Sequence, residues 1–197
     1  MSDQFDVFNE LIANPIVIFQ PTRTAPSRSV VLEEWDIIKD PVYQKVLEIR
    51  KVSSVIIKDL PEEVLVFKAD SFPQPQALFS AKYAYARKRA DFILFANNSG
   101  KKRIVFIEMK RTKDSENGII AQLKGAACVM DYCKAVSNRF LGISKCFNGA
   151  EERFVSLSDT IGKRATYPDR NAPLHDTPDC LLKLKGHSFT YHELIRR

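Results

Sequence analysis

Long apolar runs, glycine and paired cysteines are all scarce in this chain of 197 residues. No stretch approaches the roughly 18 apolar residues of a membrane-spanning helix, so we expect no membrane partner. Only 7 glycines are present, and they form no phosphate-binding loop. Asp3 and Asp6 stand near the start, where a secretory signal would be basic. The sequence therefore predicts a cytoplasmic protein.

The few cysteines and histidines show no metal-binding spacing. Cys128 and Cys133 are five residues apart, while Cys146 and Cys180 stand alone. Zinc sites use closely paired cysteines or histidines, which are missing here. We interpret the cysteines as reduced, buried thiols and the 3 histidines as ordinary core or surface residues.

Hydrophobic residues make up 45% of the chain and charged residues 27%, with a net charge of +6. A chain of this length and composition can bury one sizeable core. We therefore expect a single domain over residues 1–197. Its core is predicted over 41–157, with an N-terminal helical elaboration over 1–40 and a C-terminal elaboration over 158–197.

The pattern of apolar residues predicts an alternation of helices and strands. Helices are predicted over 2–13, 29–39, 40–51 and 115–134, with a short C-terminal helix that begins near Thr190. Strands are predicted over 54–57, 64–68, 91–96, 104–110, 140–143, 153–157 and 181–185. This order favours an α/β fold with a mixed central sheet flanked by helices.

A β-hairpin with charged residues in its strands is predicted between Asp91 and Lys110. Two apolar runs flank a polar connection there. If Ser99 and Gly100 form a two-residue turn, the numbers of paired residues sum to 199. Asp91 then lies directly opposite Glu108, on the face of the hairpin that also carries Lys110.

Two facing carboxylates predict a site for a divalent cation. Such carboxylates repel each other, and one protonates unless a cation lies between them. Mg²⁺ binds oxygen ligands, commonly one or two carboxylates with water and phosphate, which fits Asp91 and Glu108. Lys110 adds a positive charge that would activate a water or stabilise a phosphate. The alternative is a structural salt bridge between Lys110 and an acid.

The pattern of Asp91, sixteen intervening residues and then Glu108-Met109-Lys110 resembles the PD-(D/E)XK nuclease superfamily. That family carries an acidic residue on one strand and (D/E)-X-K on the next. The resemblance covers residues 81–144 and implies a restriction endonuclease-like core. It also implies that Asp91, Glu108 and the Met109 carbonyl hold Mg²⁺ or Mn²⁺, while Lys110 assists the hydrolytic water.

Other features of the family fit less sharply. Ala90 stands where the family signature has proline, although many members lack that proline. In several branches a glutamine on the next helix orients the lysine or a phosphate, which implies this role for Gln122; a residue at the core boundary is the alternative. A glutamate from the helix before the sheet often joins the site, and Glu33, Glu34 and Glu48 are the candidates; an ordinary exposed helix glutamate is the alternative for each.

Positive charge gathers around the predicted hairpin. Ten lysines and arginines stand between Lys82 and Lys113, against two acids. The residues predicted to grip a nucleic-acid backbone are Arg87, Lys88, Arg89, Lys101, Lys102 and Arg103. Such a patch binds phosphates with an affinity that falls with salt. Tyr83 and Tyr85 lie beside it and would either stack on bases or pack as ordinary aromatics.

Together these features predict a metal-dependent deoxyribonuclease that hydrolyses phosphodiester bonds, acting as an endonuclease. The resemblance favours DNA as substrate without excluding RNA. Two alternatives stay open: a non-catalytic nucleic-acid-binding module of the same fold, and a protein–protein interaction domain of the toxin or immunity type. An enzyme that cuts both strands needs two active sites, so we expect a homodimer in that case.

Overall fold

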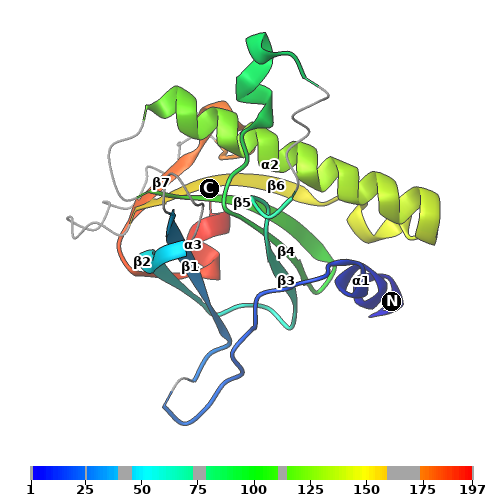
Figure 1. The fold of residues 1–197 in the computed structure, drawn as a ribbon. Helices are drawn as coiled ribbons and strands as arrows, with labels where there is room; N and C mark the ends of the chain where they lie inside the picture. Colours follow the sequence, from blue (N-terminus) through cyan, green and yellow to red (C-terminus); the bar gives the residue numbers. More distant parts are fainter. Residues whose placement is uncertain are drawn as a thin grey trace.

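The structure, a computed structural model, describes residues 2–24, 26–39, 46–72, 79–110, 115–158 and 174–196. Its elements in chain order are α1 (Ser2–Leu11), β1 (Ser29–Lys39), β2 (Val46–Lys58), β3 (Glu63–Lys68), η1 (Ala81–Arg87), β4 (Phe92–Asn98), β5 (Lys101–Lys110), α2 (Glu116–Val136), η2 (Ser137–Leu141), η3 (Ser144–Phe147), β6 (Glu151–Ser158), η4 (Pro178–Cys180), β7 (Leu182–Lys185), β8 (Ser188–Thr190) and α3 (Tyr191–Ile195). In Figure 1 the long helix α2 runs across the strands, and η1 projects beyond it.

Two sheets form the framework. The larger one has the order β3-β4-β5-β6-β7; β4 is antiparallel to both of its neighbours, whereas β5, β6 and β7 are parallel. Parallel neighbours require a crossover, and α2 provides it between β5 and β6. The smaller sheet has the order β1-β2-β8. The predicted mixed α/β fold is confirmed.

Side chains of β5 alternate between two hydrophobic cores. Ile107 and Met109 belong to the core shared with β1, β2 and α3, whereas Ile104 and Phe106 belong to the core beneath α1 and α2. On the second face, Phe106 stacks on Phe154 of β6 with ring centroids 4.8 Å apart. Because strand residues alternate in direction, the even-numbered residues of β5 point toward the α2 layer.

The helices predicted over 29–39 and 40–51 are wrong where the structure describes these residues. Residues 29–39 are strand β1 and pair antiparallel with β2; residues 40–45 lie outside the described ranges. The predicted N-terminal helical elaboration is therefore correct for α1 and wrong for β1. Leucine and glutamate favour helix, but the long ladder with the β-branched residues of β2 outweighs that preference.

The C-terminal half holds one further correction. The strand predicted over 140–143 is wrong, because α2 continues into the π-helical turn η2, which ends at Gly142 with φ 68°. The helix predicted over 115–134 is confirmed as α2, with Ser115 as its N-cap. The C-terminal helix begins after Thr190 in a capping box, as predicted. Strand β7 extends the larger sheet, so the C-terminal segment contributes to the same framework.

Candidate active site

The β4–β5 hairpin has the predicted register. Its residue pairs sum to 199 along the whole ladder, from Asn98↔Lys101 onward. The turn residues Ser99 and Gly100 have φ of 52° and 86°, the positive values that tight two-residue hairpins require. Strand β4 begins one residue after Asp91, so this side chain stands at the end of the strand, at the position opposite Glu108.

The Asp91 carboxylate is held by the neighbouring strand. Its Oδ2 accepts a hydrogen bond of 2.6 Å from the Met109 backbone N–H, and the residue is 8% exposed. The N–H and C=O groups of one strand residue point to the same side. The Met109 carbonyl is therefore also directed toward the side of β5 on which Asp91 lies.

Glu108 and Lys110 follow each other on the α2 face of β5. Glu108 is fully buried, and the side chain of Lys110 is 17% exposed. The Lys110 Nζ lies 2.5 Å from the Glu108 Oε1, so the two charges form a close ion pair. Removing one partner of such a pair would leave an uncompensated charge in the interior. The three residues of the predicted Asp, Glu, Lys motif thus lie together.

The electrostatics of the site centre on Asp91. Burial, and after it the nearby charge of Glu108, raise the pKa of its carboxyl from 3.8 to about 8. The hydrogen bond from Met109 acts in the opposite direction, as does the charge of Lys110. Ionised Asp91 and Glu108 together are therefore costly, which is the property expected of carboxylates that await a cation.

Glu34 is a third acid near this pair. It is the next residue after Val30 and Leu32 in the alternating set of β1 side chains that faces the core. Its negative charge contributes to the raised pKa of Asp91. Glu33 points away and binds Lys51 at 3.2 Å, and Glu48 is an exposed residue of β2. Among the three candidate glutamates, Glu34 is the one whose charge reaches Asp91.

Two serines of β6 complete this face of the sheet and were missed by the sequence analysis. Ser156 pairs with Glu108 and Ser158 pairs with Lys110 in the parallel ladder. Neighbours in such a ladder share a face. The alternation of Phe154, Ser156 and Ser158 was the available signal, because it places hydroxyl groups where a buried strand would carry apolar residues.

Gln122 lies in α2, on the side of the helix that also carries Gly118 and Gly125. Gly118 and Gly125 lie on one side of the helix, with Gln122 between them at a spacing of three to four residues. A Cβ on Gly125 would meet the Lys88 carbonyl oxygen at 1.7 Å, so this side packs directly on the backbone that leads to Asp91.

The predicted basic residues divide into two groups. Arg87, Lys88 and Arg89 immediately precede the site. The other group, residues 101–103, begins β5 at the hairpin turn, five to seven residues from Glu108, which corresponds to roughly 17–23 Å along a strand. The Lys102 Nζ donates to the Lys145 carbonyl at 2.8 Å. Of the two basic groups, only residues 87–89 therefore lie beside the site, although both groups are close to it in the sequence.

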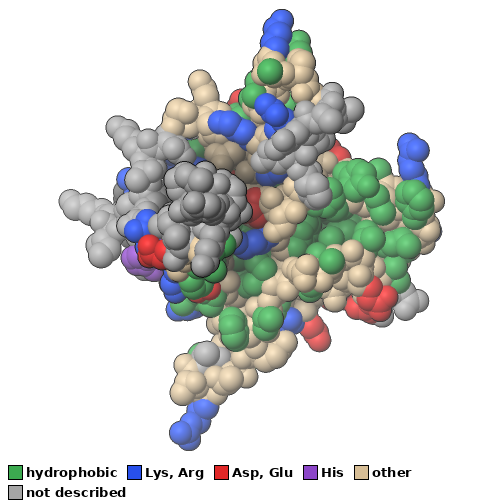
Figure 2. All heavy atoms as spheres, viewed as in Figure 1, with side chains coloured by type: hydrophobic (Ala, Val, Ile, Leu, Met, Phe, Trp, Pro, Cys, Tyr) green, Lys and Arg blue, Asp and Glu red, His purple; other side chains and the backbone are tan. Residues whose placement is uncertain are grey.

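Figure 2 shows lysine and arginine side chains over the projecting η1 region, and apolar side chains over the right-hand part of α2.

Within the described ranges, no group of three or more His, Cys, Asp or Glu side chains is arranged as a metal site. No helix in that part of the chain is long and apolar enough to cross a membrane. The chain matches no family model, no curated protein and no solved structure.

Proposed function

We propose that this protein is a metal-dependent nuclease that hydrolyses phosphodiester bonds in DNA, acting as an endonuclease. The observation that carries the proposal is the convergence of Asp91, Glu108 and Lys110 at the ends of two adjacent strands. Their arrangement supports the resemblance to the PD-(D/E)XK superfamily and its restriction endonuclease-like core. The site suits hydrolysis of a phosphodiester because it combines oxygen ligands with a cationic side chain.

The residues present fit Mg²⁺ or Mn²⁺. Asp91 offers the carboxylate oxygen that Met109 does not bind, Glu108 offers a second carboxylate, and the Met109 carbonyl is directed to the same side. Two carboxylates and a carbonyl, completed by water and substrate, match the oxygen ligands that these hard cations prefer. When bound, the cation would lower the pKa of a water and neutralise charge on the phosphate.

Each side chain has a defined task in this proposal. The Met109 N–H fixes the orientation of Asp91, and Lys110 pairs with the buried carboxylate of Glu108. Lys110 is partly exposed and would turn toward the phosphate, where its charge stabilises the developing oxyanion. Glu34, whose charge acts on Asp91, and Gln122 of α2 are proposed to orient the attacking water and the lysine.

The proposed grip on DNA begins at Arg87, Lys88 and Arg89, which precede Asp91 directly. Phosphate contacts by such residues give binding that weakens as salt rises. Residues 101–103 lie roughly 20 Å away, so a duplex would have to extend about six base pairs from the cleaved bond to reach them. Substitution of these residues is therefore expected to affect long substrates more than short ones.

A plasmid-nicking assay tests the proposal. The purified protein is incubated with supercoiled plasmid and Mg²⁺ or Mn²⁺, beside the variants Asp91→Asn and Lys110→Met. Matched controls are Asp131→Asn and Lys145→Met, which change the same residue types at exposed positions away from the cluster. Metal-dependent nicking that is lost in the first pair and kept in the controls supports the enzyme.

Other outcomes of this assay count against catalysis. Salt-sensitive DNA binding without cleavage, unchanged by Asp91→Asn, would favour the non-catalytic binding module. Absence of both binding and cleavage would favour the protein–protein interaction domain.

A further inference from the structure

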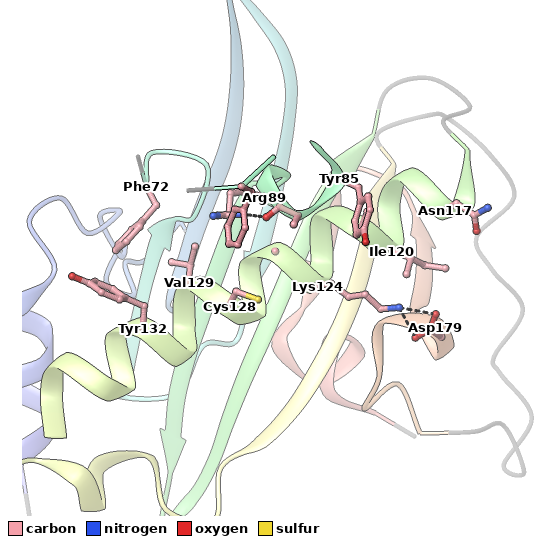
Figure 3. A pocket seen from close by; sticks show the side chains of 14 residues that line it. Phe72, Tyr85, Arg89, Asn117, Ile120, Lys124, Cys128, Val129, Tyr132 and Asp179 are labelled. Atoms are coloured by element: carbon pink, nitrogen blue, oxygen red, sulfur yellow. Dashed lines mark hydrogen bonds and ion pairs between the residues drawn. The ribbon is translucent and has the colours of Figure 1, made fainter. Parts of the chain in front are cut away.

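A pocket of about 930 Å³ lies between η1 and the outward side of α2. Four aromatic residues line it: Phe72, Phe79, Tyr85 and Tyr132. In Figure 3, Tyr85 points toward Ile120 of α2, while Phe72 and Tyr132 point toward one another. The rings of that second pair are 5.5 Å apart at 71°. This volume is in the range of pockets that hold small ligands or single building blocks of a polymer.

The aromatic rings are unusually open to solvent. Tyr85 and Tyr132 are each 58% exposed, and Phe79 is 39% exposed. Exposed aromatic rings grouped around an apolar hollow mark a binding surface rather than a core. Planar rings of this kind bind other planar rings by stacking, as proteins do with the bases of single-stranded nucleic acids.

The charges at the pocket are mainly positive. Arg89 and Lys124 line it, and Asp179 is the one acidic residue among the described lining residues. Asp179 is already engaged by Lys124 at 3.1 Å, as the dashed lines in Figure 3 mark. The Arg89 guanidinium is fixed by bonds to two backbone carbonyls, one of them that of Lys88 at 2.7 Å. The pocket therefore suits an apolar ring carried on an anionic backbone.

The pocket is next to the candidate active site. Arg89 is two residues from Asp91, which limits the separation of their Cα atoms to about 7 Å. Gly125 belongs to the pocket lining and also packs on the Lys88 carbonyl, in the segment that leads to Asp91. A chain lying across this segment would have one nucleotide at the acidic cluster and a neighbouring nucleotide at the pocket.

We propose that this pocket binds an unpaired nucleobase, so that the protein prefers single-stranded DNA or a single-stranded junction. The link between this pocket and cleavage rests on the proposed function. Binding of a base in the pocket does not require catalysis. Tyr85 stacks on one base, and Tyr132, which lies about 18 Å along α2 from Ile120, stacks on a second base of the same strand. Arg89 and Lys124 contact the phosphates between them. Base–aromatic stacking is tolerant of sequence, so the preference is for strandedness and not for a particular base.

Binding without cleavage tests this inference. Dissociation constants are measured in EDTA for an oligothymidine of about 12 nucleotides, for an abasic oligonucleotide of the same length and for a duplex. The abasic strand keeps the charge and lacks the rings. We expect the oligothymidine to bind about tenfold more tightly than the abasic strand and for Tyr85→Leu or Tyr132→Leu to remove most of that difference. Phe140→Leu is the matched control, because Phe140 is an exposed aromatic residue of η2 outside the pocket lining.

A second measurement uses the unaltered protein. Cys128, which was expected to be buried, lines the pocket and is exposed. Saturating oligothymidine should therefore slow its alkylation severalfold, and the abasic strand should not. Equal binding of the two strands, or equal alkylation with both, would overturn the inference and point to an apolar ligand other than a base. If the protein does not nick plasmid but still binds the oligothymidine more tightly than the abasic strand, only the proposed nuclease activity is refuted.

Discussion

Replacing Asp91 by asparagine should make the protein more stable at alkaline pH. The folded protein holds this carboxyl with a pKa of about 8, against 3.8 as its ordinary value, chiefly because it is buried. The ionisation of this group therefore does not oppose folding below about pH 4; its cost grows as pH rises from about 4 to about 8 and is constant above that. At 1.36 kcal/mol per pH unit, the cost approaches about 5 kcal/mol at pH 8. Asparagine keeps an oxygen for the Met109 N–H and carries no charge.

Thermal unfolding in EDTA measures this cost. One kcal/mol shifts Tm by about 2–4 °C in a chain of this size, so Asp91→Asn should raise Tm by about 10–20 °C at pH 8. The difference should shrink toward zero near pH 4. Added Mg²⁺ should raise the Tm of the unaltered protein at pH 8 and leave that of the variant nearly unchanged, because the cation requires the carboxylate.

The matched control is Asp131→Asn, an exposed acid paired with Lys134 at 3.2 Å. Its effect should stay within about 1 kcal/mol at both pH values. An Asp91→Asn variant that is less stable than the unaltered protein at pH 8 would refute the reasoning. A Tm difference that does not depend on pH would also refute it, since the ionisation of Asp91 is its proposed source.

Three further substitutions test neighbouring parts of the structure by chemical denaturation. Lys110→Met should destabilise by about 3 kcal/mol, and adding Glu108→Gln should recover most of that loss; no recovery would contradict a buried ion pair. Gly125→Ala should cost at least about 2 kcal/mol and reduce nicking, since its Cβ would clash with a backbone carbonyl. At Gly118 a Cβ would meet only side-chain atoms, the nearest being the Ser115 Oγ at 3.0 Å, so Gly118→Ala should change stability by under about 1 kcal/mol. Thr190→Ala should cost about 1 kcal/mol through loss of the capping box, and an unchanged denaturation midpoint would contradict that role.

Local rules were enough to predict the hairpin and its neighbouring helix. The turn at Ser99 and Gly100 fixes the register of β4 and β5, and the register fixes which acids face each other. Regular apolar spacing was likewise enough for α2. These features depend on residues close together in the chain, so the sequence holds the necessary information.

Features that depend on distant pairing could not be predicted in the same way. Residues 29–39 have helix-favouring leucine and glutamate, and only their pairing with β2 makes them a strand. The approach of Glu34 to Asp91 follows from that pairing, so the sequence left three glutamates as candidates. The distance between residues 101–103 and the acidic cluster was not predicted, because residues close together in the sequence can lie at opposite ends of one extended strand.

The position of a bound divalent cation tests the central claim most directly. A crystal of the protein soaked in Mn²⁺ should give an anomalous difference peak bonded to the carboxylates of Asp91 and Glu108 and to the Met109 carbonyl, and the same soak of Asp91→Asn should give none. A fully occupied Mn²⁺ at another position, with Lys110 still paired to Glu108 and no peak beside Asp91, would contradict the account.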